Sequence, residues 1–199
     1  MRDVLTRQVA DHLRVAQAIE PMLPTVEEVA RLICRAFAAG GRVYTFGNGG
    51  SAADAQHLAT EFIGRYRRDR RPLPAVALSG DPSALTCIGN DYASHEVFAR
   101  QVTALAGPGD VVVGFTTSGR SPNVVKGLAA GRAAGATTVL FSAGDGGAAA
   151  EHADFQLLVP VIEDGSVSPM TARTQEMHVL LLHLVSEWVD AWAAGELDL

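Results

Sequence analysis

The sequence has little cysteine and no long hydrophobic run. Its 199 residues include two cysteines, Cys34 and Cys87, each in an apolar helical context and neither in a pairing motif. Such cysteines indicate reduced core residues of a cytosolic protein rather than a disulfide framework. No apolar run reaches the ~18 residues of a membrane span, and residues 1–13 (MRDVLTRQVADHL) are amphipathic, unlike a signal peptide. We therefore expect a soluble, cytoplasmic protein without a membrane partner.

Positive charge is also scarce. Lysine and arginine together number 16 against 22 aspartates and glutamates, which gives a formal net charge of −6. An overall field of this sign does not favour binding to nucleic acid or to an anionic membrane. A local anion site remains compatible with it, because backbone N–H groups can supply the positive potential.

The N-terminal part of the chain is predicted to be helical. Apolar residues recur at helical spacing over residues 3–20. Two prolines, Pro21 and Pro24, end that helix, and Thr25 with Glu28 predicts a capping box for the next one. Residues 1–40 are therefore expected to form a helical extension of the α/β part.

Strand-like and helix-like segments alternate in the rest of the chain. Strands are expected over residues 43–46, 75–78, 110–115, 137–141 and 155–161. Helices are expected from residue 52 onward and over residues 81–88, 96–105, 121–135, 145–151 and 171–193, with a loop at 163–169. This alternation predicts a three-layer α/β sandwich, flavodoxin-like, with a central parallel sheet of about five strands and a long C-terminal helix. With 48% hydrophobic residues, the chain can bury one core, so residues 1–199 are expected to form a single domain.

The stretch from Val43 to Tyr66 (VYTFGNGGSAADAQHLATEFIGRY) joins a strand, a glycine-rich turn and a helix. Free N–H groups and the helix dipole make such a turn an anion site, here Asn48, Gly49, Gly50 and Ser51. The alternative is a tight turn in which glycine only supplies a positive φ. The turn is not a P-loop, because no Gly-Lys-Ser/Thr follows it. It also lacks the third glycine of the dinucleotide fingerprint.

A second loop, TTSGRS at residues 116–121, carries four hydroxyl groups: those of Thr116, Thr117, Ser118 and Ser121. Their O–H groups and the backbone N–H groups could surround a phosphate. Alternatively, the loop is a polar turn in which Ser121 only caps the following helix. The position at the carboxyl end of a buried strand, where open α/β sheets bind ligands, favours a binding role.

His57 and Glu61 are four residues apart on the helix that follows the glycine-rich turn. This spacing places the imidazole and the carboxylate on one helical face, as an acid–base pair, as metal ligands or as an exposed ion pair. Glu61 is interpreted as the only acid on the inner face of that helix beside the turn.

The final helix carries Gln175, His178 and His183 among side chains that are apolar nearly all round. A helix of this kind is buried, and its polar groups need partners. A lone histidine there is more often a hydrogen-bonded core residue, whereas the group of three favours a site. His12, His95 and His152 have no such company and are expected at the surface.

Several of these segments together resemble one protein family. The segments are GNGGSAADAQH, the EF-x-GRY stretch, GNDY at residues 89–92, TTSGRSPNVVK and TARTQEMH. They are similar, in register and over essentially the whole chain, to the sugar isomerase (SIS) superfamily. Within it they most resemble the phosphoheptose isomerases, which convert sedoheptulose 7-phosphate to D-glycero-D-manno-heptose 7-phosphate through an enediol.

The resemblance implies a role for each matching residue. It implies that Ser118 and Ser121 bind the phosphate, that Asn48 and Asp91 contact sugar hydroxyls, and that Glu61 is the base and His183 the acid. Further phosphate contacts are implied for Thr116, Thr117 and Ser51. The zinc ligands of the family fall at positions matching His57, Glu61, Gln175 and His183. A homotetramer with active sites between subunits is also implied.

The sequence departs from the family pattern in the phosphate loop. The family pattern is S-T-S-G-N-S, whereas this chain has T-T-S-G-R-S, in which Thr116 and Arg120 are the substitutions. The loop at 163–169 is longer and more acidic than usual, and Ala172 stands where many isomerases have an aspartate.

Two functions are alternatives to the isomerase: a non-catalytic relative that binds the replication initiator DnaA, and a sugar-phosphate sensor. Glu61 and His183 favour the enzyme, because the binding proteins generally lack them.

Overall fold

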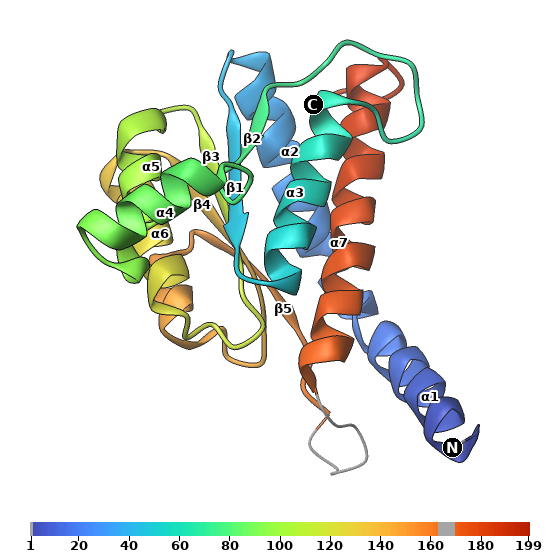
Figure 1. Ribbon diagram of the computed structural model, residues 1–199. Coiled ribbons are helices and arrows are strands. Elements are labelled where there is room, and N and C mark those ends of the chain that lie inside the picture. The colour runs from blue at the N-terminus through green and yellow to red at the C-terminus, as the bar shows by residue number, and fades with distance from the viewer. Residues whose placement is uncertain (1, 163–169) are drawn as a thin grey trace.

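A five-stranded parallel sheet lies between two layers of helices in the computed structural model, which describes residues 2–162 and 170–199 (Figure 1). The strands are β1 (Val43–Gly47), β2 (Ala75–Ala77), β3 (Val111–Phe115), β4 (Thr137–Ala143) and β5 (Phe155–Val159). Their order in the sheet is β2-β1-β3-β4-β5. In β1 and β3 the last residues, Gly47 and Phe115, are paired in the parallel register. The two strands therefore end side by side, and the loops that follow them are neighbours.

The helices divide between the two faces of the sheet. They are α1 (Arg2–Ala18), α2 (Leu23–Ala38), α3 (Gly50–Ile63), α4 (Pro82–Asp91), α5 (Ala99–Leu105), α6 (Pro122–Ala133) and α7 (Met170–Ala193). The helices α2, α3 and α7 cover one face and α4, α5 and α6 the other, while α1 projects away from the sheet (Figure 1). This arrangement confirms the predicted three-layer sandwich, with its two N-terminal helices and long C-terminal helix.

The sheet separates two hydrophobic clusters. Alternate residues of β3 point to opposite faces, so Val111 and Val113 belong to the cluster under α2, α3 and α7, whereas Val112 belongs to the cluster under α5 and α6. All five residues of β3 are buried. The continuous apolar run in the sequence is therefore explained by a strand covered on both faces.

The start of α2 differs from the prediction. The helix begins at Leu23, directly after a 3-10 turn over Glu20–Met22, with Pro24 in its first turn. Its N-cap residue, Met22, has helical dihedral angles and makes no side-chain cap. Thr25 lies inside the helix, so the predicted capping box is wrong. An N-cap residue needs a non-helical conformation, whereas the preceding turn leads straight into a helix that begins two residues before Thr25.

Some other boundaries also differ. The predicted helix at 96–105 is a 3-10 turn over Ser94–Glu96 followed by the shorter α5, and the short helix at 145–151 is a 3-10 helix over Gly147–His152. The helix α4 continues to Asp91. The predicted loop at 163–169 lies outside the described residues.

The two cysteines have different environments. Cys34 is fully buried on α2, where burial raises the pKa of its thiol to about 12 and keeps it protonated, as predicted. Cys87 is exposed on α4, and its thiol donates to Asp91 Oδ2 over 3.5 Å. The prediction of a core position for Cys87 is wrong, because no residue of α4 is buried and an apolar sequence context there does not lead to burial.

No helix in the described part of the chain is long and apolar enough to cross a membrane. The cytoplasmic location stays a prediction.

A buried polar pair links α3 to α7. Asp54 on α3 is 7% exposed, and its Oδ2 lies 3.9 Å from Nδ1 of the fully buried His178. His178 Nε2 lies 3.2 Å from the carbonyl oxygen of Ser142 on β4. A carbonyl only accepts, so Nε2 carries the hydrogen and Nδ1 presents its lone pair to Asp54. Neither Asp54 Oδ2 nor His178 Nδ1 has a hydrogen-bond partner among the described residues.

This environment shifts both pKa values. Burial raises the pKa of Asp54 from 3.8 to about 6, against the opposing effect of His57. Burial lowers the pKa of His178 from 6.5 to about 4, against the opposing bond to the Ser142 carbonyl. Both groups therefore favour the neutral form, as expected where a charge would lose its water.

The two shifts predict opposite pH dependences of the free energy of unfolding. The raised pKa of Asp54 gives a contribution that is present below pH 3.8 and is lost as the pH rises to about 6. The lowered pKa of His178 gives one that is present above pH 6.5 and is lost as the pH falls to about 4. On acidification from pH 6.5 to 4, Asp54→Asn keeps only the His178 contribution and should lose up to about 3 kcal/mol of stability, whereas His178→Gln keeps only the Asp54 contribution and should gain up to about 3 kcal/mol, at ~1.4 kcal/mol per pKa unit. The two variants should therefore differ by up to about 6 kcal/mol. Urea unfolding of both variants measures this difference, in which the other titrating groups cancel. Parallel pH profiles would contradict the assignment.

Candidate active site

A pocket of about 320 Å3 lies at the carboxyl ends of β1 and β3. It is lined by Asn48, Gly49, Gly50, Ser51, Phe115, Thr116, Thr117, Ser121, Thr171 and Gln175. The pocket is therefore formed by the two loops that the sequence singled out, together with the first turns of α7.

Two helices begin at this pocket. Gly49, the N-cap residue of α3, has a φ of 55° and no side-chain cap, and Ser121, the N-cap residue of α6, makes no side-chain cap either. The positive dipole ends of both helices are thus left for a ligand. Four N–H groups at these helix starts nevertheless donate to carbonyl oxygens within their own turns, those of Ala52, Ala53, Val124 and Val125. An anion is the ligand that this arrangement favours, although the chain as a whole is acidic.

Glycine is required at Gly47, where a Cβ atom would lie 2.5 Å from the backbone carbonyl oxygen of Ser51. At Gly50 a Cβ atom would lie 2.5 Å from the side-chain nitrogen of Gln175, which is the flexible end of a side chain and could shift. The GNGGS turn therefore brings α3 against both the end of β1 and the first turns of α7. Gly49 does supply a positive φ, as one interpretation of the turn required. The turn also lines the pocket, so its role is not limited to changing the direction of the chain.

The hydroxyl groups of the TTSGRS loop are not equivalent. Thr116 is buried, and its Oγ1 lies 3.4 Å from Ser121 Oγ. Because Ser121 makes no side-chain cap to α6, the interpretation of the serine as a mere helix cap is not supported. Ser118 is exposed, accepts a hydrogen bond from the Arg120 backbone N–H over 3.2 Å and is not among the residues that line the pocket.

Asn48 and Asp91, which the family resemblance implies as contacts of the sugar hydroxyls, lie in different places. Asn48 lines the pocket and exchanges two hydrogen bonds of 2.8 Å with Asn123 on α6. Asp91 is exposed at the C-terminal end of α4, where its carboxylate accepts from Asn90 and Cys87, and it does not line the pocket. Asn123 was not singled out from the sequence, although it directly follows the Ser121-Pro122 helix start.

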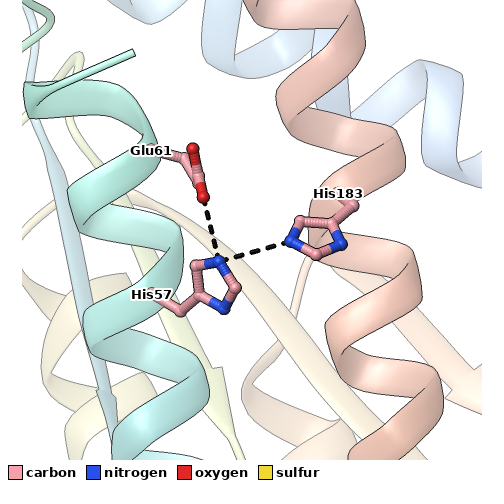
Figure 2. A group of neighbouring side chains, drawn as sticks. All are labelled: His57, Glu61 and His183. Carbon is pink, nitrogen blue, oxygen red and sulfur yellow. Dashed lines mark hydrogen bonds and ion pairs between the residues drawn. The ribbon is translucent and has the colours of Figure 1, made fainter. Parts of the chain in front are cut away.

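A second group lies deeper along α3, where α3 faces α7 (Figure 2). His57 Nε2 lies 2.9 Å from Glu61 Oε1 and 3.3 Å from Nε2 of His183. His57 and Glu61, four residues apart on α3, thus lie next to a histidine of α7, as the sequence suggested. The side chain of Glu61 is 15% exposed and that of His57 37%, so the group is open to small molecules on one side.

His183 is held by aromatic neighbours and has a shifted pKa. Its ring lies 4.9 Å from that of His57 in an edge-on arrangement and 5.4 Å from that of Tyr66. Burial lowers the pKa of His183 below its usual value, His57 lowers it further, and Glu61 acts in the opposite direction. A neutral imidazole near pH 7 can bind a metal or exchange protons with a substrate.

The donor set of His57, Glu61 and His183 suits a zinc ion. One ligand atom from each residue can be chosen so that all lie within 4.8 Å of one another. At a tetrahedral ion with bonds of about 2.0–2.1 Å, ligand atoms are about 3.3 Å apart. The observed separations of 2.9 and 3.3 Å are close to this value. Two imidazoles and a carboxylate that leave one position open are typical of a catalytic zinc site.

Gln175 lies in the pocket, with its amide against Gly50. It precedes His183 by eight residues, or ~12 Å along α7 at ~1.5 Å per residue. The structure thus groups Gln175 with the loops that line the pocket. Its expected additional role as a zinc ligand stays a prediction.

The sequence analysis missed the buried acid of α3. Glu61 is not the only acid on the inner face of this helix, because Asp54 is buried and faces His178. The periodicity of α3 could have indicated this, since Asp54 and Leu58 are four residues apart and both are buried. His178 itself is a hydrogen-bonded core residue, one of the two alternatives left open for it.

Two of the surface histidines do have acidic neighbours. His12 Nδ1 lies 2.7 Å from Glu176 Oε2 on α7, and His95 Nε2 lies 3.3 Å from Glu96 Oε1. The expectation that His12 and His95 have no neighbouring polar group is therefore wrong. For His12 the partner is 164 residues away in the chain, and only the packing of α1 on α7 reveals it.

The fold and the pocket define the class of the protein. Residues 8–143 match the family model of the SIS domain. A phosphoheptose isomerase structure from Neisseria gonorrhoeae superposes with a TM-score of 0.85 at 37% identity, over 96% of this chain and 98% of that one. One from Francisella tularensis superposes with a TM-score of 0.82 at 29% identity, over 95% of each chain.

Curated relatives narrow the class to one family. A phosphoheptose isomerase of Solidesulfovibrio magneticus is 48% identical over 195 residues, which is 96% of this chain and 92% of the relative. One of Aquifex aeolicus is 46% identical over 172 residues, 86% of each. This chain belongs to the phosphoheptose isomerase family of SIS-domain proteins, as its sequence motifs indicated.

The geometry of the pocket predicts which hydroxyl groups hold an anion. Thr116→Val combined with Ser121→Ala should weaken the binding of inorganic phosphate at least about tenfold, because each hydrogen bond to a charged group is worth ~1.5–3 kcal/mol. Ser118→Ala is the matched control and should have the smaller effect, since Ser118 lies outside the pocket lining. Titration followed by phosphorus NMR measures the affinities, and circular dichroism checks the fold. A larger effect of Ser118→Ala would contradict the assignment and support the role implied by the family resemblance.

Proposed function

We propose that the protein is an aldose–ketose isomerase that interconverts sedoheptulose 7-phosphate and D-glycero-D-manno-heptose 7-phosphate. The main support is that one helix, α3, begins at an anion pocket and carries His57 and Glu61 further along. Ser51 at the pocket and Glu61 are ten residues apart, or ~15 Å along the helix at ~1.5 Å per residue. A sugar phosphate of several carbons can place its phosphate in the pocket and its carbonyl end beside His57, Glu61 and His183. The names of the relatives support the same substrate class.

Isomerisation moves a carbonyl group between C1 and C2. We assign the carbon-bound proton to Glu61, which removes it from C1 of the ketose and returns it to C2. His183 donates a proton to the oxygen on C2 and accepts one from the oxygen on C1, so that the enediol forms and collapses without net proton transfer. A partly buried carboxylate suits the first task, and an imidazole that is neutral near pH 7 suits the second.

The substrate phosphate is assigned to the pocket. Its contacts come from the N–H groups at the starts of α3 and α6 and from the hydroxyls of Ser51, Thr116, Thr117 and Ser121. Asn48 and Gln175 are placed to contact the sugar. Ser118 and Asp91 lie outside the lining of the pocket, so a direct contact from either needs a movement of its loop or a second copy of the chain.

Zinc is the proposed cofactor and would be held by His57 Nε2, Glu61 Oε1 and His183 Nε2. The Glu61 and His183 ligand atoms lie 2.9 and 3.3 Å from His57 Nε2. Glu61 Oε2 and His183 Nδ1 would then remain for the proton transfers. When bound, it would polarise the carbonyl and stabilise the negative charge on the enediol oxygens. The short distances among the three ligand atoms support this proposal, and metal analysis of the purified protein tests it.

A homotetramer is the proposed assembly. One face of α1 exposes four apolar side chains, those of Val4, Leu5, Val9 and Leu13, each between 55% and 64% exposed. The helix projects from the body of the molecule, and water is an unfavourable surrounding for such a stripe (Figure 1). A second copy of the chain is the partner that the family resemblance suggests, which sedimentation velocity can test.

The function is tested by conversion of sedoheptulose 7-phosphate to the aldose, followed by NMR. Glu61→Gln and His183→Gln should each lower kcat at least ~10²-fold, the lower end for a positioned acid or base. Their combined loss should be less than additive, because both groups act in the same step. His152→Gln serves as a control for the loss of a histidine away from the site. Turnover close to wild type in Glu61→Gln would remove the base assignment and favour a non-catalytic SIS protein.

A further inference from the structure

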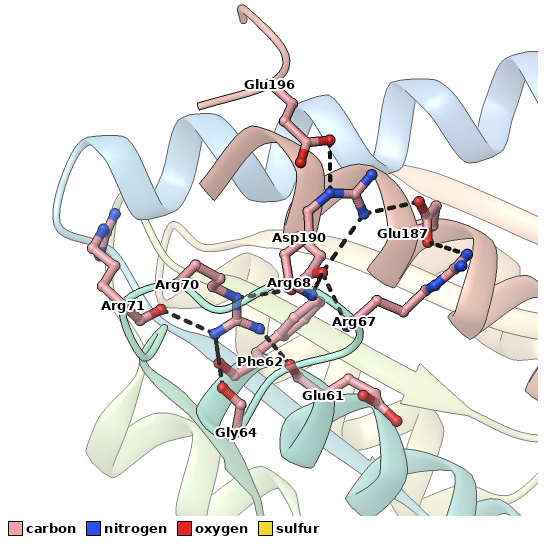
Figure 3. Close-up of polar contacts among 10 residues, drawn as sticks. All are labelled: Glu61, Phe62, Gly64, Arg67, Arg68, Arg70, Arg71, Glu187, Asp190 and Glu196. Carbon is pink, nitrogen blue, oxygen red and sulfur yellow. Dashed lines mark hydrogen bonds and ion pairs between the residues drawn. The ribbon is translucent and has the colours of Figure 1, made fainter. Parts of the chain in front are cut away.

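A buried ion pair lies where the C-terminal end of α3 meets α7 (Figure 3). Arg70 Nε donates to Asp190 Oδ1 over 3.0 Å, and each of the two side chains is 1% exposed. Burial acts to raise the pKa of Asp190, but the bonds from the Arg68 and Arg67 backbone N–H groups and from the Arg70 guanidinium together lower this pKa below its usual value. A buried pair is costly to desolvate and is not by itself a source of stability, so its further contacts indicate what it does.

The guanidinium of Arg70 binds the end of α3. Its Nη2 donates to the carbonyl oxygen of Glu61 over 2.6 Å, and its Nη1 donates to those of Phe62 and Gly64 over 2.7 and 3.0 Å. The last carbonyls of a helix have no partner within the helix, and a cation there also complements the dipole. Arg70 therefore fixes the backbone of Glu61 itself, whose side chain belongs to the group in Figure 2.

The carboxylate of Asp190 binds the segment that follows α3. Its Oδ2 accepts from the backbone N–H groups of Arg67 and Arg68 over 3.0 and 2.7 Å. This segment includes Tyr66, whose ring lies 5.4 Å from that of His183. Asp190 thus holds in place the aromatic ring that packs on His183.

Asp190 and His183 are also related by their positions on α7. They are seven residues apart, so they lie on the same face of the helix, separated by ~10 Å at ~1.5 Å per residue. A single connection therefore runs from the backbone of Glu61 through Arg70 to Asp190 and along one face of α7 to His183.

We propose that Arg70 and Asp190 are positioning residues that set the separation and orientation of Glu61 and His183. The inference rests on the proposed function, because that function assigns both residues to the reacting and metal-binding group. Nothing else in the described part of the chain donates to the Glu61 carbonyl from outside α3. A shift of about 1 Å between two such groups can cost about 10²-fold in rate.

The test compares variants of the pair with a variant of the exposed part of the same cluster. Arg70→Lys keeps the charge but loses the planar fork, and Asp190→Asn keeps the shape but loses the charge. Each should lower kcat and the affinity for zinc by about 10- to 100-fold, as is typical for residues that orient metal ligands, while KM changes little. Glu196→Gln is the matched control. It removes only the negative charge that pairs with Arg68 Nε, on a side chain that is 54% exposed, and it should change neither quantity more than about twofold.

Two measurements are made on each folded variant, well below its unfolding temperature: turnover of sedoheptulose 7-phosphate, and zinc affinity by competition with a coloured chelator. A role in stability alone would lower the unfolding temperature and leave both quantities unchanged, which would overturn the inference. If the wild-type protein binds zinc but shows no turnover, the proposed function fails, and the zinc affinities still decide the positioning role. A wild type without either property would overturn both.

Tyr66→Leu provides a route that does not depend on the stability of the buried pair. It removes the ring beside His183 but leaves Arg70 and Asp190 in place. We expect a decrease in kcat and zinc affinity in the same direction as for Asp190→Asn. If Arg70→Lys and Asp190→Asn do not fold, unchanged values in Tyr66→Leu overturn the proposal.

Discussion

The structure depends on the close packing of α3 between the end of β1 and α7. Gly47 allows the approach to β1, since a Cβ atom there would lie 2.5 Å from the backbone carbonyl oxygen of Ser51, and at Gly50 the side-chain amide of Gln175 on α7 occupies the space beside the backbone. The consequence is that one rigid helix connects an anion pocket at its N-terminus to a histidine–carboxylate group near its C-terminus. Because a helix has a constant rise per residue, the distance between the pocket and the pair of His57 and Glu61 is set by the number of residues between them.

The electrostatics of the site follow from the same helix. At its N-terminal end, backbone N–H groups and hydroxyls offer positive potential without a lysine, so a net charge of −6 does not prevent anion binding. At its C-terminal end, the guanidinium of Arg70 complements the carbonyl groups. Between them, Asp54 and His178 are buried in environments that favour their neutral forms. The side chains proposed to react lie near the C-terminal end of α3, where His57, Glu61 and His183 meet.

Much of this organisation could be predicted from the sequence, because it depends on local patterns. The three-layer sandwich, its five strands and the two ligand-type loops follow from periodicity and turn residues. Predictions failed where one local sequence pattern is compatible with two different positions in the folded protein. Cys87 has an apolar context but lies on a helix with no buried residue, and Thr25 has a capping partner but lies inside a helix that begins at Leu23. His12 was expected without a neighbour, yet Glu176 lies 2.7 Å away.

The family, the order of the elements and the pairing of His57 with Glu61 could be inferred from the sequence, since helical spacing places residues i and i+4 on one face. The family resemblance also implied that His183 joins this group, and the structure supplies the contact between His183 and His57. That Ser121 rather than Ser118 faces the pocket, and that Arg70 reaches from the end of α3 to Asp190, could be seen only in the folded protein. These contacts join residues as far as 126 positions apart. The physical reason is that spacing along a chain specifies which residues share a face, whereas the packing of helices on the sheet specifies which faces meet.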